Sequence, residues 1–291
     1  MKNYLKLLRV KHYIKNLLIF APLVFSRNLT NPPLLLNACL GFLVFCLISS
    51  FVYIVNDVRD CEKDRLHSTK CKRPIASGAV SKRSAGVLAA VLLLLAAALC
   101  VYLCRVSFWA AVVPLLYVGV NLLYSFGLKN QPVIDVTILA LGFVLRLMYG
   151  SAVTGIAVSA WLLLTVMALS FYLGLGKRRG ELMREQDGTR GVLKAYNKSF
   201  LDKNMYLCLG LAIVFYSLWC IDADTVARIG SNALVWTVPL ALVICLKYGL
   251  DVEGDSDGDP VEVVLGDKVL LCVIALFALA AVGLVYFGKL L

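Results

Sequence analysis

The sequence lacks several features by which metal-binding and nucleotide-binding domains are recognised. It has only two histidines, His12 and His67, so a zinc site of the usual Cys and His spacing cannot be built from it. It has ten cysteines but no Cys-x-x-Cys pair, and most of them lie in apolar runs, where they act as small hydrophobic residues. There is no Walker motif and no Gly-x-Gly-x-x-Gly. These absences exclude zinc enzymes, disulfide-rich domains and the common nucleotide-binding folds.

Charge is also scarce. Charged residues make up 16% of the chain, whereas 60% of the 291 residues are hydrophobic, and the mean hydropathy is +0.83. A single water-soluble core cannot absorb so much apolar surface. Apolar runs approaching the roughly 20 residues that cross a bilayer recur along the whole length. We therefore predict an all-α integral membrane protein, with about nine transmembrane helices in a single domain over residues 1–291. The expected spans are 14–27, 33–56, 84–104, 107–125, 132–153, 159–177, 204–221, 231–248 and 268–288.

Basic residues are placed very unevenly along the chain. The formal net charge of +11 does not indicate a nucleic-acid partner, because Lys and Arg lie in short loops between the apolar segments. With the N-terminus inside, most of the 29 basic residues fall on the inner side, and of the 18 acidic residues only Asp222 and Asp224 fall outside. This distribution obeys the positive-inside rule. We expect a multi-pass protein of the cell inner membrane, with its N-terminus and its active site facing the cytoplasm.

An aspartate motif ends the second predicted span. It comprises Asn56, Asp57, Asp60 and Asp64, and on a continuing helix the three carboxylates would share one stripe. Carboxylates so close repel one another unless a cation sits among them, and oxygen ligands of this kind suit Mg²⁺. The simpler alternative is a solvated helix end. We favour a Mg²⁺ site, because carboxylates emerging directly from a membrane span are costly.

Two further pairs of charged residues are candidates for a binding site. Lys70 and Arg73 follow the aspartates and are suited to phosphate oxygens, although anchoring to anionic lipid explains them as well. Asp135 and Arg146 lie in the fifth predicted span, eleven residues apart and so on one side of a helix. An arginine this deep is expected to face a cavity and to pair with a carboxylate or a ligand phosphate.

From Asn56 to Gly78 the sequence resembles the UbiA-type prenyltransferase superfamily, whose NDxxDxxxD motif is followed by K-x-x-RP-[IL]-x-x-G. Four more segments narrow the resemblance to the decaprenyl-phosphate phosphoribosyltransferases. They are the opening LRVKHYIKNLLIFAP at 8–22, the stretch from Tyr124 to Arg146, the GKRRGEL segment at 176–182 with Arg190 and Tyr196 beyond it, and DPVEVVLGD at 259–267.

The resemblance implies a helical bundle around a cavity that opens to the cytoplasmic face, with Mg²⁺ on the aspartates bridging to a substrate diphosphate. It implies transfer of 5-phosphoribose from phosphoribosyl pyrophosphate to a polyprenyl phosphate lipid, with release of pyrophosphate. Tyr124 is then a candidate for orienting the ribose, and Asp135 for a catalytic carboxylate. The implied phosphate-binding residues are Lys15, Lys70, Arg73, Lys129, Arg146, Lys177, Arg178, Arg179, Glu181, Arg190 and Tyr196.

One departure separates two enzyme classes. The second DxxxD motif of aromatic prenyltransferases is missing after the sixth predicted span, where Lys177-Arg178-Arg179 stands instead. Phosphoribosyl pyrophosphate carries a separate 5-phosphate, and this cluster with Lys129 and Arg190 is predicted to bind it. The alternative is a prenyltransferase that moves a polyprenyl chain from its diphosphate to an aromatic or other acceptor. A transporter is a third reading, supported only by the repeated spans. A homo-oligomer is compatible with the sequence.

Overall fold

The computed structural model describes residues 2–66, 70–184, 191–254 and 258–288. Those residues form helices and connecting turns, with no strand among them. The helices are α1 (Lys2–Leu8), η1 (Val10–Phe20), α2 (Ala21–Phe25), α3 (Pro32–Arg65), η2 (Lys70–Lys72), α4 (Lys82–Leu103), α5 (Trp109–Phe126), η3 (Leu128–Asn130), α6 (Ile134–Thr154), α7 (Ala160–Arg184), η4 (Gly191–Ala195), α8 (Lys198–Ile221), α9 (Ala223–Ile229), η5 (Ala233–Thr237), α10 (Val238–Glu253), α11 (Pro260–Gly266) and α12 (Lys268–Phe287).

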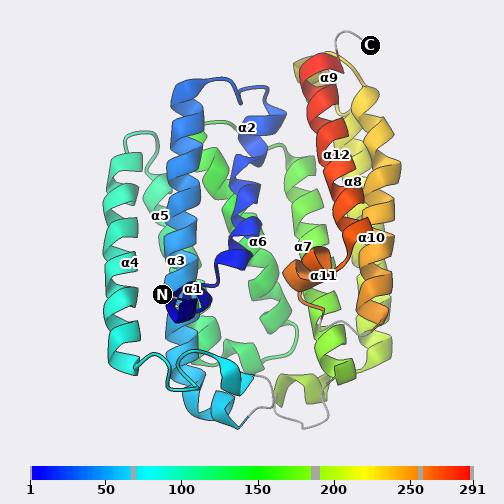
Figure 1. Ribbon diagram of the computed structural model, residues 1–291. Helices are drawn as coiled ribbons and strands as arrows, with labels where there is room; N and C mark the ends of the chain where they lie inside the picture. Colours follow the sequence, from blue (N-terminus) through cyan, green and yellow to red (C-terminus); the bar gives the residue numbers. More distant parts are fainter. Residues whose placement is uncertain (1, 67–69, 185–190, 255–257, 289–291) are drawn as a thin grey trace.

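The long helices run up and down beside one another in a bundle (Figure 1). On one side α3, α4 and α5 pack together, and on the other α7, α8, α10 and α12 do so, with α6 contacting both groups. The lower end of the bundle in Figure 1 carries the ends of α3, α5, α7 and α10 and the starts of α4, α6, α8 and α12. We call this the charged end, because it holds the aspartate motif and the basic loops.

Among the described residues, eight helices are long and apolar enough to cross a membrane. They match the predicted spans from 33–56 onward, except that α3 and α7 continue well beyond 56 and 177. The first predicted span, 14–27, is different: it consists of η1 and the short α2. A 3-10 helix rises about 2.0 Å per residue, so the two together still extend about 30 Å, which is the thickness of a bilayer core. The expected all-α membrane fold is confirmed.

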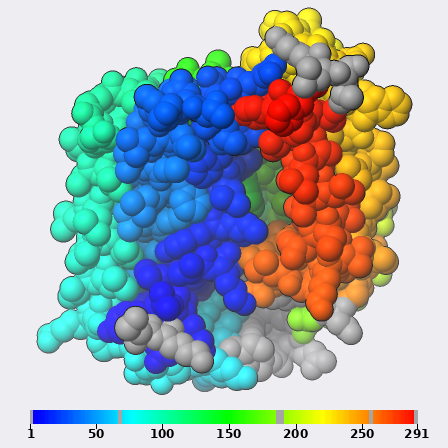
Figure 2. Space-filling model, turned by 45° about the horizontal axis from the view of Figure 1, so that its top comes forward, coloured from blue at the N-terminus to red at the C-terminus, as the bar shows by residue number. Residues whose placement is uncertain are grey.

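The N-terminal segment, formed by η1 and α2, lies against α6. A Cβ added at Gly150 would overlap the backbone carbonyl of Ile19, so only glycine allows this close approach. On its other side the N-terminal segment makes few contacts with α12. Figure 2 shows the surface hollowed between the blue N-terminal segment and the red α12, with green atoms from the middle of the chain deep inside the hollow.

Polar side chains at the loop junctions fix where several helices begin. Asn31, Ser81, Asn197, Asp259 and Asp267 each accept a hydrogen bond from a backbone N–H in the first turn of the helix that follows. Such caps satisfy donors that have no partner within the helix. They fix the first residues of α4, α8, α11 and α12, which lie at the charged end together with the candidate site.

Candidate active site

The aspartate motif lies on the last two turns of α3, which continues unbroken to Arg65. Asp57 and Asp64 are seven residues apart, close to two helical turns, and therefore lie on the same face. Both are buried, at 2% and 4% exposure, while Asp60 is half-buried. A carboxylate this deeply buried needs a cationic partner. The structure supplies one for each aspartate.

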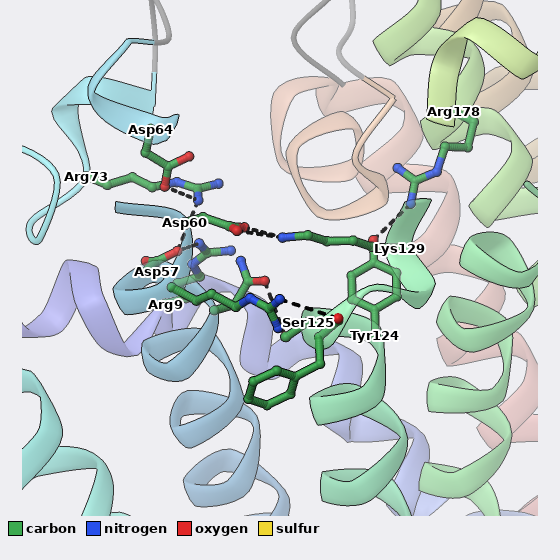
Figure 3. A network of polar contacts seen from close by, with 12 residues as sticks. Arg9, Asp57, Asp60, Asp64, Arg73, Tyr124, Ser125, Lys129 and Arg178 are labelled. Atoms are coloured by element: carbon green, nitrogen blue, oxygen red, sulfur yellow. Dashed lines mark hydrogen bonds and ion pairs between the residues drawn. The ribbon is translucent and has the colours of Figure 1, made fainter. Parts of the chain in front are cut away.

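Arg73 joins Asp57 and Asp64 through a single atom. Its Nη1 donates to Asp57 Oδ1 at 3.0 Å and to Asp64 Oδ2 at 2.8 Å (Figure 3). Arg9 binds the same oxygen of Asp57 at 2.6 Å and lies over the Tyr53 ring. Arg9 has a left-handed backbone, with φ at +53°, which is uncommon for a residue other than glycine. That conformation turns the chain between α1 and η1 and brings the guanidinium to the aspartate.

Asp60 faces away from this pair and binds Lys129, whose Nζ lies 2.6 Å from both carboxylate oxygens. Asn56 also points elsewhere: its Oδ1 accepts a hydrogen bond from Ser125 at 3.3 Å. Within the described parts of the chain, no three Asp, Glu, His or Cys residues lie close enough together to hold a metal ion. The four predicted ligands are therefore neighbours at one end of α3, but they are not gathered around a single point.

The aspartates nevertheless fit a magnesium ion that is shared with a substrate. Mg²⁺ is usually held by one or two carboxylates together with substrate phosphates, and seldom by a cage made of protein alone. Asp57 and Asp64 already face one positively charged atom, Arg73 Nη1, so their oxygens are placed to share a cation. Their donor chemistry is all oxygen, which Mg²⁺ prefers.

A second group of polar residues, the Arg178 network, connects α5, α6 and α7 and the segment after η4. Arg178 and Asp135 are both fully buried and lie 2.5 Å apart. Arg178 also binds Glu181 at 2.6 Å and donates to the Tyr124 hydroxyl at 3.2 Å. Tyr196 donates to the other oxygen of Asp135 at 2.6 Å. Tyr124 is thus held by Arg178, and Figure 3 shows it beside Lys129 of the aspartate site.

The backbone before Asp135 is strained. Val133 has φ at +68° and ψ at −46°, and the N–H of Ile134 donates to the carbonyl of Pro132 at 2.8 Å. This is a γ-turn of the rare type, and a β-branched residue at its centre is a true outlier. The N–H of Val133 donates to the Tyr196 hydroxyl at 2.6 Å. Burial and the hydrogen bond to Asp135 raise the pKa of Tyr196 to about 12, so its hydroxyl stays protonated and keeps donating.

The side chains of the predicted basic cluster Lys177-Arg178-Arg179 point in different directions and lie in separate contacts. Consecutive residues on an α-helix point about 100° apart, and each of the three binds a different carboxylate. Lys177 binds Asp259 at 2.7 Å, Arg178 belongs to the network above, and Arg179 binds Asp202 at 2.5 Å and the Val252 carbonyl at 3.1 Å. Arg178 and Arg179 are buried in these contacts, so neither is placed like a free phosphate ligand.

Lys177 has a second lysine beside it. Lys15, on η1, lies 3.7 Å from Asp259, so the two lysines share one carboxylate. Asp259 is brought there by Gly258, whose φ is +72° and whose added Cβ would clash with the backbone of Gly176 and Lys177. Burial acts to raise the pKa of Asp259, but Lys177 and Lys15 outweigh it and hold that pKa well below its usual range. We call Lys15 and Lys177 the lysine pair, and Asp259 its carboxylate.

Arg146 lies near the middle of α6 and is 4% exposed. It donates to Asn16 Oδ1 at 2.7 Å, to the Gly142 carbonyl at 2.6 Å and to the Tyr117 hydroxyl at 3.1 Å. These partners are neutral, and among the described residues no carboxylate forms an ion pair with Arg146. Of the two expected partners, a carboxylate or a ligand phosphate, the carboxylate is not found among the described residues, and Asp135 pairs with Arg178 instead.

Of the remaining predicted phosphate ligands the structure describes Lys70, and two residues that were not predicted, Arg9 and Asp259, also take part in the contacts at this end. The carbonyl of Lys70 accepts from the N–H of Arg73 at 2.9 Å, which places both in one short turn; Arg190 lies outside the described residues. Sequence reasoning did not select Arg9 or Asp259 for the site, although both fall in segments that carried the family resemblance. The signal that could have found them is charge balance, because buried acids and bases at this end each require a partner.

Solved structures of similar shape have the same fold. A UbiA homologue from Archaeoglobus fulgidus, bound to GPP and Mg²⁺, superimposes with a TM-score of 0.74 over 97% of this chain and 99% of its own, at 21% identity. At that identity the likeness concerns the fold alone. It agrees with the helical architecture described above.

Similar sequences are found among curated proteins. The decaprenyl-phosphate phosphoribosyltransferase of Mycolicibacterium smegmatis is 36% identical over 284 residues, which cover 91% of this chain and 87% of that protein. The protein of the same name from Corynebacterium glutamicum is 35% identical and covers 91% and 81%. The profile of the UbiA prenyltransferase family matches residues 17–250. With a match over most of its length and these relatives, the chain belongs to the UbiA prenyltransferase family.

Proposed function

We propose that this protein transfers 5-phosphoribose from phosphoribosyl pyrophosphate to a polyprenyl phosphate and releases pyrophosphate. The observation that carries the proposal is the 35–36% identity, over nine-tenths of the chain, to two decaprenyl-phosphate phosphoribosyltransferases. The positive-inside distribution of basic residues supports placement in the cell inner membrane, with the charged end in the cytoplasm, where a water-soluble donor is available.

The aspartate site is proposed to hold the pyrophosphate end of the donor. Asp57 and Asp64 would hold Mg²⁺, with Asp60 beside them. When bound, the ion neutralises the charge that develops on the leaving pyrophosphate. Arg9, Arg73 and Lys129 are the basic residues that touch these carboxylates. A divalent cation would compete for the same oxygens, and the freed side chains would then be available for donor phosphates.

The reaction needs little acid–base chemistry. An oxygen of the acceptor phosphate attacks the anomeric carbon of the ribose, and the bond from that carbon to pyrophosphate breaks, so no proton has to be removed from the nucleophile. The protein must bring two anions together and hold the ribose still. Tyr124 is proposed to orient the ribose, because Arg178 fixes its hydroxyl next to the aspartate site. Asp135 is a positioning residue that acts through Arg178, since both are fully buried.

The structure changes which residues we propose for the 5-phosphate. Arg178 and Arg179 are buried in ion pairs, so the earlier assignment of the whole basic cluster to this phosphate is replaced. Arg73 and Lys129 contact the aspartates directly, and Lys70 lies in the same short turn as Arg73. These residues are proposed as its cationic partners.

The test compares two donors with the same purified protein. With Mg²⁺, phosphoribosyl pyrophosphate and a polyprenyl phosphate, we expect pyrophosphate to be released only when donor and acceptor are both present. Asp57→Asn should abolish the release without changing the elution of the protein from a sizing column. Pyrophosphate release from a prenyl diphosphate and an aromatic acceptor, with none from phosphoribosyl pyrophosphate, would instead establish a prenyltransferase.

A further inference from the structure

The lysine pair is not explained by the aspartate site. Lys15 and Lys177 come from η1 and α7, and their shared partner Asp259 caps α11, so three separate elements meet at one carboxylate. Both lysines are largely buried, at 16% and 28% exposure of their side chains. Two ammonium groups around one carboxylate leave an excess of positive charge in a place where charge is expensive.

More positive charge lies close by. The guanidinium of Arg146 binds Asn16, the residue that follows Lys15 on η1. Among the described residues, Asp259 is the only carboxylate that forms an ion pair with any of these three cations; Glu181 also lies near Lys177, but it is paired with Arg178. The Nδ1 atom of His12, one turn before Lys15, is buried without a hydrogen-bond partner in the described part of the chain. Three cations, one carboxylate and one unpartnered imidazole nitrogen together form a cluster with an excess of positive charge.

A phosphate monoester would balance this excess of positive charge. Such a group carries about −1.5 to −2 at pH 7 and offers three acceptor oxygens. Three cations against one carboxylate give the complementary excess. A diphosphate with its metal ion is already provided for at the aspartate site, where acids and bases balance: Asp57, Asp60 and Asp64 face Arg9, Arg73 and Lys129.

The position favours a phosphate that arrives on a lipid. Lys15 is part of the N-terminal segment, and that segment forms one wall of the hollow seen between it and α12 in Figure 2. The hollow runs alongside a segment that we treat as membrane-spanning, so an apolar chain lying there would remain among apolar surroundings. Arg9, which binds Asp57, also accepts a hydrogen bond at its backbone carbonyl from the N–H of His12 at 2.8 Å, so the two sites are neighbours.

We infer that Lys15 and Lys177 receive the phosphate of the lipid acceptor, with Arg146 and His12 completing its surroundings, and that Asp259 holds the two lysines until the lipid arrives. The inference rests on the proposed function for the identity of the acceptor as a polyprenyl phosphate. It makes Asp259 a competitor of the ligand. Bound phosphate and Asp259 repel each other, and removing the carboxylate charge should therefore strengthen binding.

Measuring the affinity for a prenyl phosphate tests the inference without requiring turnover. Purified protein in detergent, with a chelator and no donor, is titrated calorimetrically with farnesyl phosphate, a short prenyl phosphate; farnesol and inorganic phosphate serve as the tail and the headgroup alone. Lys15→Gln and Lys177→Gln should each weaken farnesyl phosphate binding about ten- to a hundredfold. Lys15→Arg should keep most of the affinity. Asp259→Asn should tighten binding, since the amide still caps α11 but carries no charge.

Lys247→Gln is the matched control. Lys247 binds Asp251 and Asp267, also shares its charge between elements, and is 25% exposed, but it lies on α10 outside both sites. Its loss should leave binding unchanged. All variants are compared for thermal unfolding, so that a misfolded protein is recognised.

The possible outcomes separate the sources of phosphate. If the Lys15 and Lys177 variants weaken binding of phosphoribosyl pyrophosphate with Mg²⁺ but leave farnesyl phosphate unaffected, the site belongs to the donor and the inference is overturned. Weaker binding in Asp259→Asn also overturns it. If the expected pattern holds but phosphoribosyl pyrophosphate is never consumed, the proposed function fails while the lipid-phosphate site stands.

Discussion

Removing Arg178 should destabilise the protein more than any other single change in the Arg178 network. Arg178 and Asp135 have no exposed side-chain surface, and the arginine also pairs with Glu181. Replacing Arg178 by Met leaves the Asp135 carboxylate buried without a cation, although Tyr196 still donates to it. Breaking a buried ion pair in this way typically costs about 3 to 5 kcal/mol of the free energy of unfolding.

The partner variant should behave differently. Asp135→Asn leaves Arg178 paired with Glu181, and the new amide oxygen can still accept from Arg178, while the amide NH2 takes the position that faces the Tyr196 hydroxyl. We expect a smaller loss of about 1 to 3 kcal/mol. The double variant Asp135→Asn/Arg178→Met removes both buried charges, so it should be more stable than Arg178→Met alone. The two variants that lack Arg178 should lose turnover, because Tyr124 loses the guanidinium that fixes it, whereas Asp135→Asn should keep part of the turnover.

The assay is unfolding in mixed micelles with increasing SDS, followed by tryptophan fluorescence, with turnover measured in parallel. The reasoning predicts the order Arg178→Met, then the double variant, then Asp135→Asn, from least stable to most stable. If the losses of the two single variants simply add in the double variant within about 0.5 kcal/mol, the residues are not coupled and the argument is refuted.

Four further outcomes are expected. Asp60→Asn and Asp64→Asn should each lose most turnover while remaining monodisperse in detergent; full activity in both would remove the metal assignment. Arg9→Ala should raise the Mg²⁺ affinity of the donor-free protein in calorimetry, because Arg9 occupies Asp57; a lower affinity would contradict that competition. Val133→Gly should raise the thermal unfolding temperature, since glycine relieves an outlier that costs about 1 to 3 kcal/mol; a clear fall would disprove strain there. Cys71 should react with an impermeant thiol reagent from the cytoplasmic side alone, and labelling in intact cells would reverse the topology.

The helical spans could be predicted from the sequence because an apolar run of about 20 residues indicates a membrane-spanning segment, and the charges of the loops indicate its orientation. The exception was the first span, where η1 takes a 3-10 geometry between α1 and α2. Hydropathy does not distinguish a 3-10 helix from an α-helix. The close approach of this segment to α6, between Ile19 and Gly150, joins residues far apart in sequence.

The sequence predicted residues that belong to the candidate site, but it did not predict which of them form ion pairs with one another. The aspartates of α3 and the bases after them were selected, and the structure places them together at one end of the bundle. Which base faces which acid depends on helix phase and on loops. Lys177, Arg178 and Arg179 are adjacent in sequence yet belong to three different contacts. The role of Asp259 depends on Gly258, whose backbone conformation has no signature in hydropathy or charge.

The most direct test of the account is transfer of label into lipid. Protein purified in detergent is incubated with Mg²⁺, phosphoribosyl pyrophosphate labelled in the ribose, and a polyprenyl phosphate, and the mixture is extracted with organic solvent. The account predicts labelled lipid that retains the 5-phosphate, formed in equal amount to the pyrophosphate released and absent in Asp57→Asn. Label that stays entirely in the aqueous phase, under conditions where the same preparation binds both substrates, would contradict it.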